Sequence, residues 1–391
     1  MNILIYRYGS ICEPYIIETF KKLNINVIEE TTEVVQKNLM PSDRIKIIKN
    51  ALDKHQPMFV FSINFFPMIA DVCHIYGIKY LCWTVDCPVM ELFSTSIQHD
   101  TNRVFMFDRA QYKIIHPYNP DGTFYLPLAA GTEQFDKTIS SIPREDKVKF
   151  SHDISFVGSL YIEKNPMRTV TKLPEYMTGY INGVVEASLK VMGYNFLEET
   201  VTEEMIAALK KAGLSYYNTN YSVTDTSRYL TAHSYLGAQA TEVERIRTLN
   251  TLAQYFPVDL YTLSDTSDLK NVQVRGSAKT LTEMPKIFHL SKINLNMTTK
   301  PIQTGLPLRI FDIIGCGGFC MTNFQAELPE YFDIGVEIEA YSSLEELIDK
   351  CSYYLTHESE RKQIALNGYK KVKEYHTYTN RIADMLRVGM S

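Results

Sequence analysis

The sequence predicts an α/β protein made of two Rossmann-like domains. Its 391 residues exceed what one ordinary hydrophobic core accommodates, so two domains are expected. Short apolar runs alternate with amphipathic runs along most of the chain, which is the pattern of parallel strands covered by helices on both faces. In such folds a ligand binds outside the carboxyl ends of the strands, so we expect a site in a cleft that the two domains face.

The first domain is expected over residues 1–135. Apolar runs predict buried strands at 2–6, 26–29, 58–62, 79–84, 103–107 and 124–126. Helical patterns predict helices between them at 14–23, 42–54, 66–76 and 109–116. In the helix at 42–54, Ile45, Ile48 and Leu52 repeat at helical spacing and give it one apolar face. The regular alternation of strand and helix favours a parallel sheet.

The second domain is expected over residues 150–375, after a polar stretch at 132–152 that we interpret as the connection between the domains. Its strands are predicted at 153–158, 258–263, 272–275, 293–297, 319–322 and 336–338. Its helices are predicted at 284–291, 307–315, 344–355 and 358–374, with a last helix of the chain at 378–387. Residues 165–240 carry helical patterns and little strand signal, which predicts a helical insertion after the first strand.

Three helices of the second half are predicted to begin at capping boxes, in which Ser or Thr precedes Glu by three residues. The pairs are Thr200 with Glu203, Thr241 with Glu244, and Ser342 with Glu345.

Composition limits the class of protein. A net charge of −5 argues against a nucleic-acid protein that relies on bulk positive charge. The N-terminal apolar run is too short for a signal peptide, and the longest one, 58–70, is broken by Asn64 and Pro67, so no transmembrane segment is expected. Seven cysteines without a Cys-x-x-Cys pair favour reduced thiols in a cytoplasmic protein. Cys316 and Cys320 have no further His or Cys nearby, so no metal site is expected.

The most informative segment for function is 304–323. A Gly305-Leu-Pro turn precedes a helix that carries Arg309 in its first turn and Asp312 one turn later on the same face. A helix N-terminus attracts phosphate, Arg309 could contact phosphate oxygens, and Asp312 could accept hydrogen bonds from ribose hydroxyls. The alternatives are ordinary αβ construction and an ion pair between Arg309 and Asp312. Gly305 and Leu308 are included in the candidate donor site.

Other candidate donor-binding residues lie on predicted strands and their ends. Gly158 ends a strand, where a loop without a side chain would let phosphate approach backbone N–H groups; it could equally be a turn glycine. Asn294 and Asn296 alternate with apolar residues and point to one face, where they would meet the donor or the next loop. Ser291 precedes them and could approach the base or the phosphates.

The C-terminal part resembles the CgeB-like (spore-maturation protein-like) glycosyltransferases, a branch of the two-domain GT-B enzymes. The matching segments in residues 285–385 are Ser291-Lys-Ile-Asn-Leu-Asn296, Gly305-Leu-Pro-Leu-Arg-Ile-Phe-Asp312, Gly317-Gly318, Tyr341-Ser-Ser-Leu-Glu-Glu-Leu347, Tyr353-Tyr-Leu355, Glu360-Arg-Lys-Gln-Ile-Ala365 and His376-Thr-Tyr378. The N-terminal half is similar to the partner domain of these enzymes through Trp83-Thr-Val-Asp-Cys-Pro88, Phe107-Asp-Arg109 and Leu126-Pro-Leu128.

The resemblance implies a hexosyltransferase that uses a nucleotide-sugar, most often a UDP-sugar, as substrate, with no cofactor and no bound metal. The donor would lie on the C-terminal domain, and a protein or glycan acceptor would lie against the N-terminal one. The C-terminal helix at 376–391 would pack back on the first domain. The sequence leaves the role of the insertion open: it could shape the acceptor site or make a dimer contact in a homo-oligomer. One departure concerns the two Glu residues, with seven residues between them, that many retaining GT-B enzymes carry at this helix: Thr304 and Asp312 stand at those positions.

Asp86 is the candidate general base, because it follows a predicted strand end and an inverting transferase needs a carboxylate to accept the acceptor proton. The alternative is a loop-capping Asp before Pro88. Asp108 is a candidate acceptor-side residue or a helix N-cap. Trp83 could stack on the acceptor or pack in the core. A catalytically inactive protein that binds a nucleotide or sugar with the same fold is the alternative function, kept open by Thr304.

Overall fold

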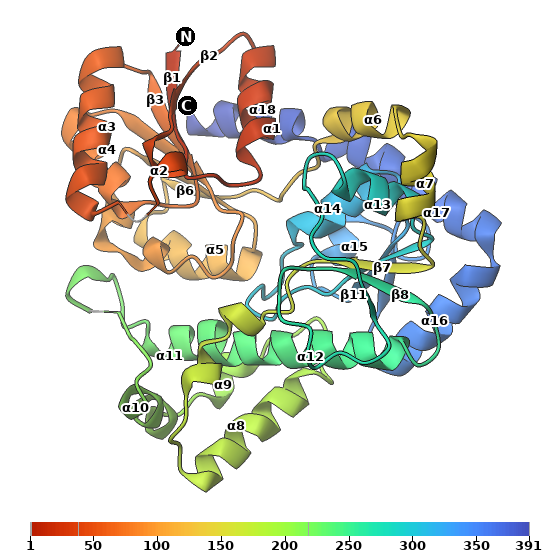
Figure 1. Cartoon of the computed structure of the whole chain (residues 1–391). Coiled ribbons are helices and arrows are strands. Elements are labelled where there is room, and N and C mark those ends of the chain that lie inside the picture. Colours follow the sequence, from red (N-terminus) through yellow and green to blue (C-terminus); the bar gives the residue numbers. More distant parts are fainter. Residues whose placement is uncertain (1, 38, 218, 391) are drawn as a thin grey trace. The chain divides into compact units, whose positions relative to one another are not determined.

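The computed structural model describes residues 2–37, 39–217 and 219–390, which fold into two compact units (Figure 1). The first unit comprises Met1–Leu128, Asn218–Thr226 and Tyr378–Ser391. The second unit comprises Ala129–Tyr217 and Ser227–Thr377. Each unit contains a six-stranded parallel sheet, as the α/β prediction requires.

The sheet of the first unit has the strand order β2-β1-β3-β4-β5-β6. Its strands are β1 (Asn2–Tyr6), β2 (Asn26–Glu30), β3 (Phe59–Ile63), β4 (Lys79–Trp83), β5 (Asn102–Met106) and β6 (Thr123–Tyr125). The helices between them are α1 (Glu13–Lys22), α2 (Thr32–Val35), α3 (Pro41–His55), α4 (Pro67–Tyr76) and α5 (Arg109–Ile115), with single turns at Met90–Phe93, Thr95–Gln98 and His116–Tyr118. The central strands β3 and β4 are almost entirely buried because helices cover both faces of the sheet, which is why they read as continuous apolar runs.

The last helix, α18 (Tyr378–Gly389), belongs to the first unit. The Tyr378 ring stacks on Tyr15 of α1 at a centroid distance of 5.3 Å and meets the edge of Trp83 at 5.9 Å. The Arg381 guanidinium donates hydrogen bonds to the carbonyl oxygens of Pro127 and Leu128. Aromatic packing and these two charged hydrogen bonds hold α18 against the sheet.

The sheet of the second unit has the order β12-β11-β10-β7-β8-β9. Its strands are β7 (Ile154–Val157), β8 (Val258–Tyr261), β9 (Gln273–Val274), β10 (Ile293–Asn296), β11 (Cys320–Asn323) and β12 (Glu339–Tyr341). The helices around it are α6 (Thr132–Ser140), α7 (Arg144–Phe150), α13 (Met284–Leu290), α14 (Leu308–Gly315), α15 (Leu328–Tyr331), α16 (Leu344–Thr356) and α17 (Glu358–Tyr375). Phe156, Leu260 and Leu295 on the strands form one buried cluster with Leu249 and Leu347 on the helices.

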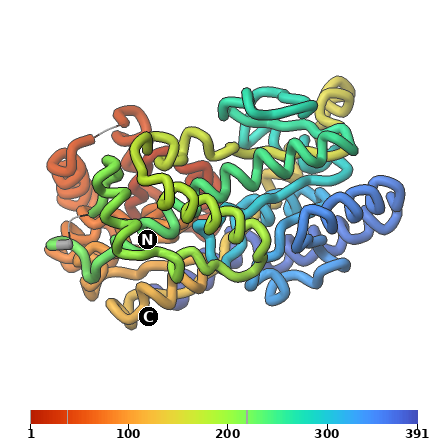
Figure 2. Tube along the Cα trace, turned by 90° about the horizontal axis from the view of Figure 1, so that it is seen from below, coloured from red at the N-terminus to blue at the C-terminus, as the bar shows by residue number. Residues whose placement is uncertain are grey.

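A mainly helical segment separates β7 from β8, as predicted. It contains short turns at Ile162–Lys164 and Pro166–Thr169, then α8 (Glu175–Ser188), α9 (Leu197–Thr200), α10 (Glu203–Lys211), a turn at Thr219–Tyr221, α11 (Ser227–Leu230), a π-helical turn at Thr231–Leu236 and α12 (Gly237–Leu252). Helix α8 packs beside α12, and both are visible in green in Figures 1 and 2. None of the helices in the described part of the chain is long and apolar enough to cross a membrane.

The interpretation of 132–152 as a connecting segment was wrong. Most of these residues form α6 and α7, which pack against α13 in the second unit. Phe135 and Phe150 are the buried anchors of the two helices, whereas the charged residues around them face outward. Each of these two short helices buries only one or two large side chains, so most of its residues are polar. A segment of that composition is typical of a linker.

The three capping boxes were displaced or absent. Helix α10 is capped by Thr202, whose hydroxyl accepts from the Met205 N–H, and α16 is capped by Ser343. Thr241 is inside α12, where its hydroxyl donates to the Gly237 carbonyl oxygen. The predicted strand at 336–338 also shifts to β12. Neighbouring Ser and Thr residues offer alternative caps, and tertiary packing selects among them.

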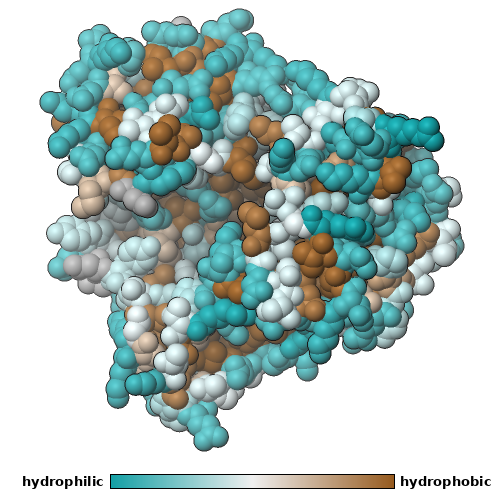
Figure 3. All heavy atoms as spheres, in the orientation of Figure 1, coloured by the Kyte–Doolittle hydropathy of each residue, from teal (hydrophilic) through white to brown (hydrophobic). Residues whose placement is uncertain are grey.

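The exposed surface combines hydrophobic and hydrophilic side chains. In Figure 3, hydrophobic side chains occur as separate groups among hydrophilic ones on the face shown.

All seven cysteines are free thiols, and only Cys87 is not buried.

Candidate functional site

The carboxyl edge of the second unit's sheet carries the candidate site. Strands β7, β10 and β11 are adjacent and parallel, so the loops after them meet at this edge. Gly158 follows β7, Thr298 follows β10, and α14 begins after Pro307 at its N-cap. Gly305 is buried, and Leu308, the first residue of α14, is partly buried. Loop ends and a helix N-terminus therefore meet where parallel α/β sheets bind ligands.

Two amides fix these loops to one another. The Asn296 side chain donates to the Thr298 hydroxyl at 3.0 Å and to the Thr322 hydroxyl at 2.9 Å. The Asn323 side chain accepts from the Thr298 N–H at 2.8 Å and donates to the Thr298 carbonyl oxygen at 3.3 Å. Asn296 thus contacts the next loop, one of its two predicted alternatives, and supports the shape of the edge.

Asn294 lies deeper in the sheet. Its amide donates to the carbonyl oxygens of Phe288 and Phe319 and accepts from the Ser155 hydroxyl at 2.9 Å. These contacts use both ends of a side chain that is almost fully buried. The structure therefore places Asn294 as a link between strands.

A buried arginine that the sequence prediction missed ties two loops of the edge together. Arg245 of α12 donates to the Ser159 carbonyl oxygen after β7 and to the Met297 carbonyl oxygen after β10, each at 2.6 Å. Its guanidinium lies over the rings of Phe156 and Tyr161, at 5.4 and 5.1 Å from their centroids. Burial lowers the pKa of Arg245 from its usual value. The cation is held by backbone carbonyls and aromatic faces, which fixes its position.

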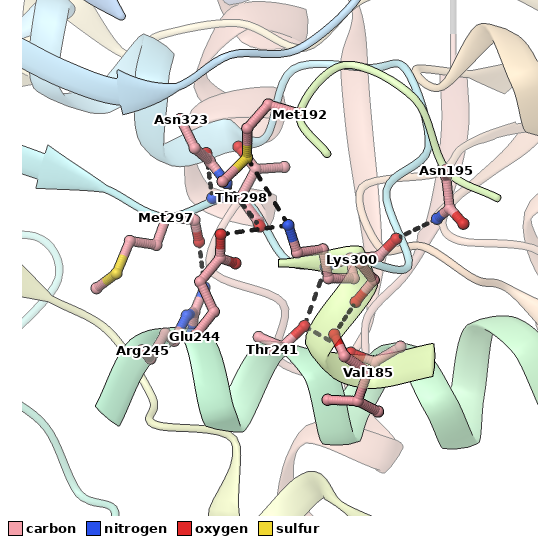
Figure 4. Close-up of polar contacts among 12 residues, drawn as sticks. Val185, Met192, Asn195, Thr241, Glu244, Arg245, Met297, Thr298, Lys300 and Asn323 are labelled. Atoms are coloured by element: carbon pink, nitrogen blue, oxygen red, sulfur yellow. Dashed lines mark hydrogen bonds and ion pairs between the residues drawn. The ribbon is translucent and has the colours of Figure 1, made fainter. Parts of the chain in front are cut away.

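Lys300 connects the same edge to the helical segment (Figure 4). Its ammonium forms an ion pair with Glu244 of α12 at 3.2 Å. Its backbone N–H donates to the Thr241 hydroxyl at 3.0 Å, and its carbonyl oxygen accepts from the Asn195 amide at 2.7 Å. Helix α12 and the loop after α8 therefore hold the loop that follows β10.

Arg309 and Asp312 form an ion pair on α14, with 3.3 Å between Nη1 and Oδ2. The Arg309 guanidinium also lies over the Phe288 ring at 5.2 Å. Asp312 is only 4% exposed. Burial raises the pKa of Asp312 to about 6, and the positive charge of Arg309 lowers it by less. An incompletely compensated carboxylate one turn from a helix N-terminus can accept hydrogen bonds from a ligand.

Thr304, in the turn that precedes α14, is hydrogen-bonded to a glutamate. Its hydroxyl donates to Glu327 at 2.6 Å, and the Glu327 N–H donates back to the Thr304 carbonyl oxygen at 3.2 Å. Glu327 is buried. A carboxylate therefore lies beside the turn that precedes α14, although it comes from a different part of the sequence.

Ser291 is placed at the other edge of the sheet. It precedes β10 and lines a cavity at the amino ends of the strands, together with His152 and Asp259. Strand β10 separates it from the carboxyl edge by about 13 Å, at about 3.3 Å per residue. Ser291 is therefore not brought together with Arg309 and Asp312.

In the first unit, Asp86 lies at the carboxyl edge after β4. The Asn64 amide, in the loop after β3, donates to the Asp86 carboxylate at 2.7 Å and to the Tyr8 hydroxyl at 3.0 Å. The side-chain oxygen of Asn64 accepts from the Val85 N–H at 3.0 Å. Burial raises the pKa of Tyr8, and the charge of Asp86 raises it further. Asp86 is exposed, so its carboxylate is oriented by Asn64 and accessible from solvent.

The other two acceptor-side candidates are buried in the first unit. The Asp108 carboxylate accepts from the N–H groups of Ala110 and Gln111 as the N-cap of α5. Trp83 is 1% exposed, and its indole N–H donates to the Leu126 carbonyl oxygen at 3.3 Å. Asp108 is therefore a helix N-cap and Trp83 a core residue, which are the structural alternatives considered for these two side chains. Within the described ranges, no group of three or more His, Cys, Asp or Glu side chains could hold a metal ion.

Comparisons with known proteins agree with this architecture. Residues 245–387 match a family model described as glycosyl transferase-like. No curated protein sequence matches the chain significantly. Among solved structures, HepE from Anabaena in complex with UDP-glucose is similar with a TM-score of 0.53, 11% identity and coverage of 99% of both chains.

Two further structures share the arrangement. Sucrose-phosphate synthase from Thermosynechococcus elongatus gives a TM-score of 0.51 and 8% identity over 100% of this chain and 98% of that one. The β-glucosyltransferase of phage T4 in complex with UDP-glucose gives 0.50 and 10% identity over 100% and 98%. The two parallel sheets with flanking helices are those of GT-B glycosyltransferases, so the chain has the GT-B fold.

Proposed function

We propose that this protein is a glycosyltransferase that moves a hexose from a UDP-sugar to a protein or glycan acceptor. The observation that carries the proposal is Asp312, a buried carboxylate near the start of α14, within the segment that matches the glycosyl transferase-like model. The proposed donor site is the carboxyl edge of the second unit's sheet. UDP is proposed because the similar Anabaena and phage T4 structures contain UDP-glucose. Within GT-B enzymes, the motifs at 305–312 and 360–365 favour the CgeB-like branch.

Each residue has a role set by its position. Ionised Asp312 accepts hydrogen bonds from the ribose hydroxyls. Arg309 and the N-terminus of α14 meet the negative charge of the diphosphate, so the proposal includes no resident metal ion. Arg245 and Asn296 are positioning residues, because they hold the loops after β7 and β10 in place. Gly158 begins the first of these loops. Its N–H donates to the Tyr261 carbonyl oxygen at 3.0 Å and a side chain there would crowd the Phe156 ring, so its role is to shape the loop beside the proposed donor site.

The proposed reaction is a substitution at the anomeric carbon. The acceptor oxygen forms a bond to that carbon while the bond to the diphosphate oxygen breaks, and the nucleoside diphosphate leaves with the bonding electron pair. Asp86 receives the proton of the acceptor hydroxyl. The Asn64 amide holds the Asp86 carboxylate for this step.

Thermal unfolding in the presence of UDP-, GDP-, dTDP- and CMP-sugars tests the proposal. A ligand that binds only the folded state raises the melting temperature, so UDP-sugars should give the largest rise. If the protein is an enzyme, it should also hydrolyse the same donor slowly when no acceptor is present. A rise without any hydrolysis or transfer would indicate a binding protein, and no rise with any nucleotide at millimolar concentration would refute the donor site.

A further inference from the structure

A second cavity lies at the amino edge of the second unit's sheet. Its volume is about 610 Å³, within the range of small-molecule sites. It is lined by residues that precede β7, β8 and β10 and by the first turns of α17. Because the proposed donor site is at the carboxyl edge, the two sites are on opposite edges of one sheet and cannot share a ligand.

Three carboxylates line this amino-edge cavity, and each already has a basic partner. The ion pairs are Asp153–Lys292 at 2.7 Å, Glu358–Lys362 at 2.6 Å and Asp259–Arg275 at 2.6 Å. The buried His152 makes a second contact to Asp259, at 3.1 Å. Each of these carboxylates is therefore already paired with a cation, and none of the three remains to pair with a further basic side chain.

Arg361 is that further basic group. It is 5% exposed and lines the cavity from α17. Its Nη1 donates to the Tyr354 carbonyl oxygen, and it forms no ion pair with any residue in the described part of the chain. Burial lowers the pKa of Arg361, with smaller opposing contributions from Glu358 and Asp153. A buried guanidinium without a counter-charge is costly unless an anion compensates it.

Two further features favour an anion at the same place. Ser291 is 6% exposed, and its side-chain hydroxyl has no hydrogen-bond partner among the described residues. The first turn of α17, an 18-residue helix, borders the cavity through Glu358 and Arg361. The positive end of a helix adds to the attraction of a negative ligand.

The cavity continues into a more apolar one. His289, Gly317, Lys362 and Ala365 line both this cavity and a neighbour of about 330 Å³, which also contacts Leu366. An anionic group at Arg361 would thus leave space for an organic part of the ligand.

We propose that the amino-edge cavity is a binding site for a small phosphate-bearing metabolite, with Arg361 and Ser291 contacting the phosphate and Lys362 at the rim. A phosphate suits the site because it accepts several hydrogen bonds and takes a guanidinium in bidentate geometry. The proposal concerns a different edge from the donor site and does not depend on the transferase reaction.

Calorimetric titration of the full chain with inorganic phosphate, glucose 6-phosphate and ribose 5-phosphate tests the site and identifies the source of the phosphate. We expect at least one of the organic phosphates to bind more tightly than inorganic phosphate. Arg361→Gln should weaken that binding about tenfold or more, and Ser291→Ala about threefold or more. Since Arg361 also bonds to Tyr354, the folding of that variant is checked by thermal unfolding.

Lys362→Glu provides a test that does not risk folding, because this side chain is 72% exposed. The matched control is Lys370→Glu, an exposed lysine on the same helix that does not line the cavity. Lys362→Glu should weaken binding about tenfold, whereas Lys370→Glu should leave it unchanged and neither should alter the affinity for UDP. No binding of any probe at millimolar concentration, equal losses in both lysine variants, or displacement of the bound phosphate by UDP would overturn the proposal.

Discussion

Replacing Asp312 by Asn should stabilise the fold at neutral pH while weakening donor binding. The pKa of Asp312 is raised from 3.8 to about 6 by burial. The native state therefore binds this proton more tightly than the unfolded chain does. The stabilisation from the protonated form is complete below about pH 3.8 and is lost as the pH rises through about 6. At about 1.4 kcal/mol per pH unit, the loss by pH 8 approaches about 3 kcal/mol.

The Asp312→Asn variant has no charge to bury at this position and should not show this loss. Its free energy of unfolding should exceed that of the wild type by up to about 3 kcal/mol at pH 8, and the difference should shrink toward pH 4. The lost ion pair with Arg309 reduces the gain, but that guanidinium is 24% exposed and can be hydrated. Subtracting the free energy of unfolding of the wild type from that of the variant at each pH removes the contributions of all other titrating groups.

Urea unfolding of both proteins between pH 4 and 8 measures this difference, and calorimetry with UDP measures the cost to function. Wild-type affinity for UDP should rise as Asp312 ionises through about pH 6, whereas the variant should bind about tenfold more weakly with little pH dependence. A variant that is less stable than the wild type at pH 8 and binds UDP normally would refute both the perturbed carboxylate and its role with the ribose.

Three other substitutions separate the remaining roles. Asp86→Asn should lower the transfer rate about 100-fold or more without changing the affinity for the donor, and an unchanged rate in kinetic assays would contradict the assignment of the base. Arg245→Met should destabilise the second unit by about 3 kcal/mol in urea unfolding, because two carbonyl oxygens lose a charged donor; a loss under about 0.5 kcal/mol would show that the contacts are dispensable. Glu244→Gln leaves the largely buried Lys300 without its counter-charge and should cost about 3 kcal/mol at pH 7, so a neutral effect would contradict the ion pair.

The fold could be predicted from local pattern because buried parallel strands are apolar on both faces. The predicted strand at 58–62 lies within one residue of β3, and the predicted helix at 307–315 nearly coincides with α14. Short helices with one buried side chain, such as α6 with Phe135, carry too little pattern to be recognised. Boundaries also depended on which of several hydroxyls the final packing selected, as at Ser343.

The site was less predictable because its geometry depends on distant partners. The amide of Asn296 is satisfied by Thr322, and the guanidinium of Arg245 by carbonyls after β7 and β10, none of which the sequence identifies as neighbours. The sequence shows Glu242, Glu244 and Arg245 only as three charged residues within one turn of a helix, and the structure is needed to show that all three are buried. Ser291 comes before β10 in the sequence, and a residue before a strand lies at the amino end of that strand. The sequence therefore already indicated that Ser291 is at the amino edge of the sheet and not at the carboxyl edge.

The most direct test of the central claim is a crystal structure of the protein with UDP. The account predicts that the diphosphate lies at the N-terminus of α14 near Arg309, with the ribose hydroxyls within hydrogen-bonding distance of the Asp312 carboxylate. UDP bound elsewhere, for example in the amino-edge cavity, or ribose hydroxyls directed away from Asp312, would contradict it.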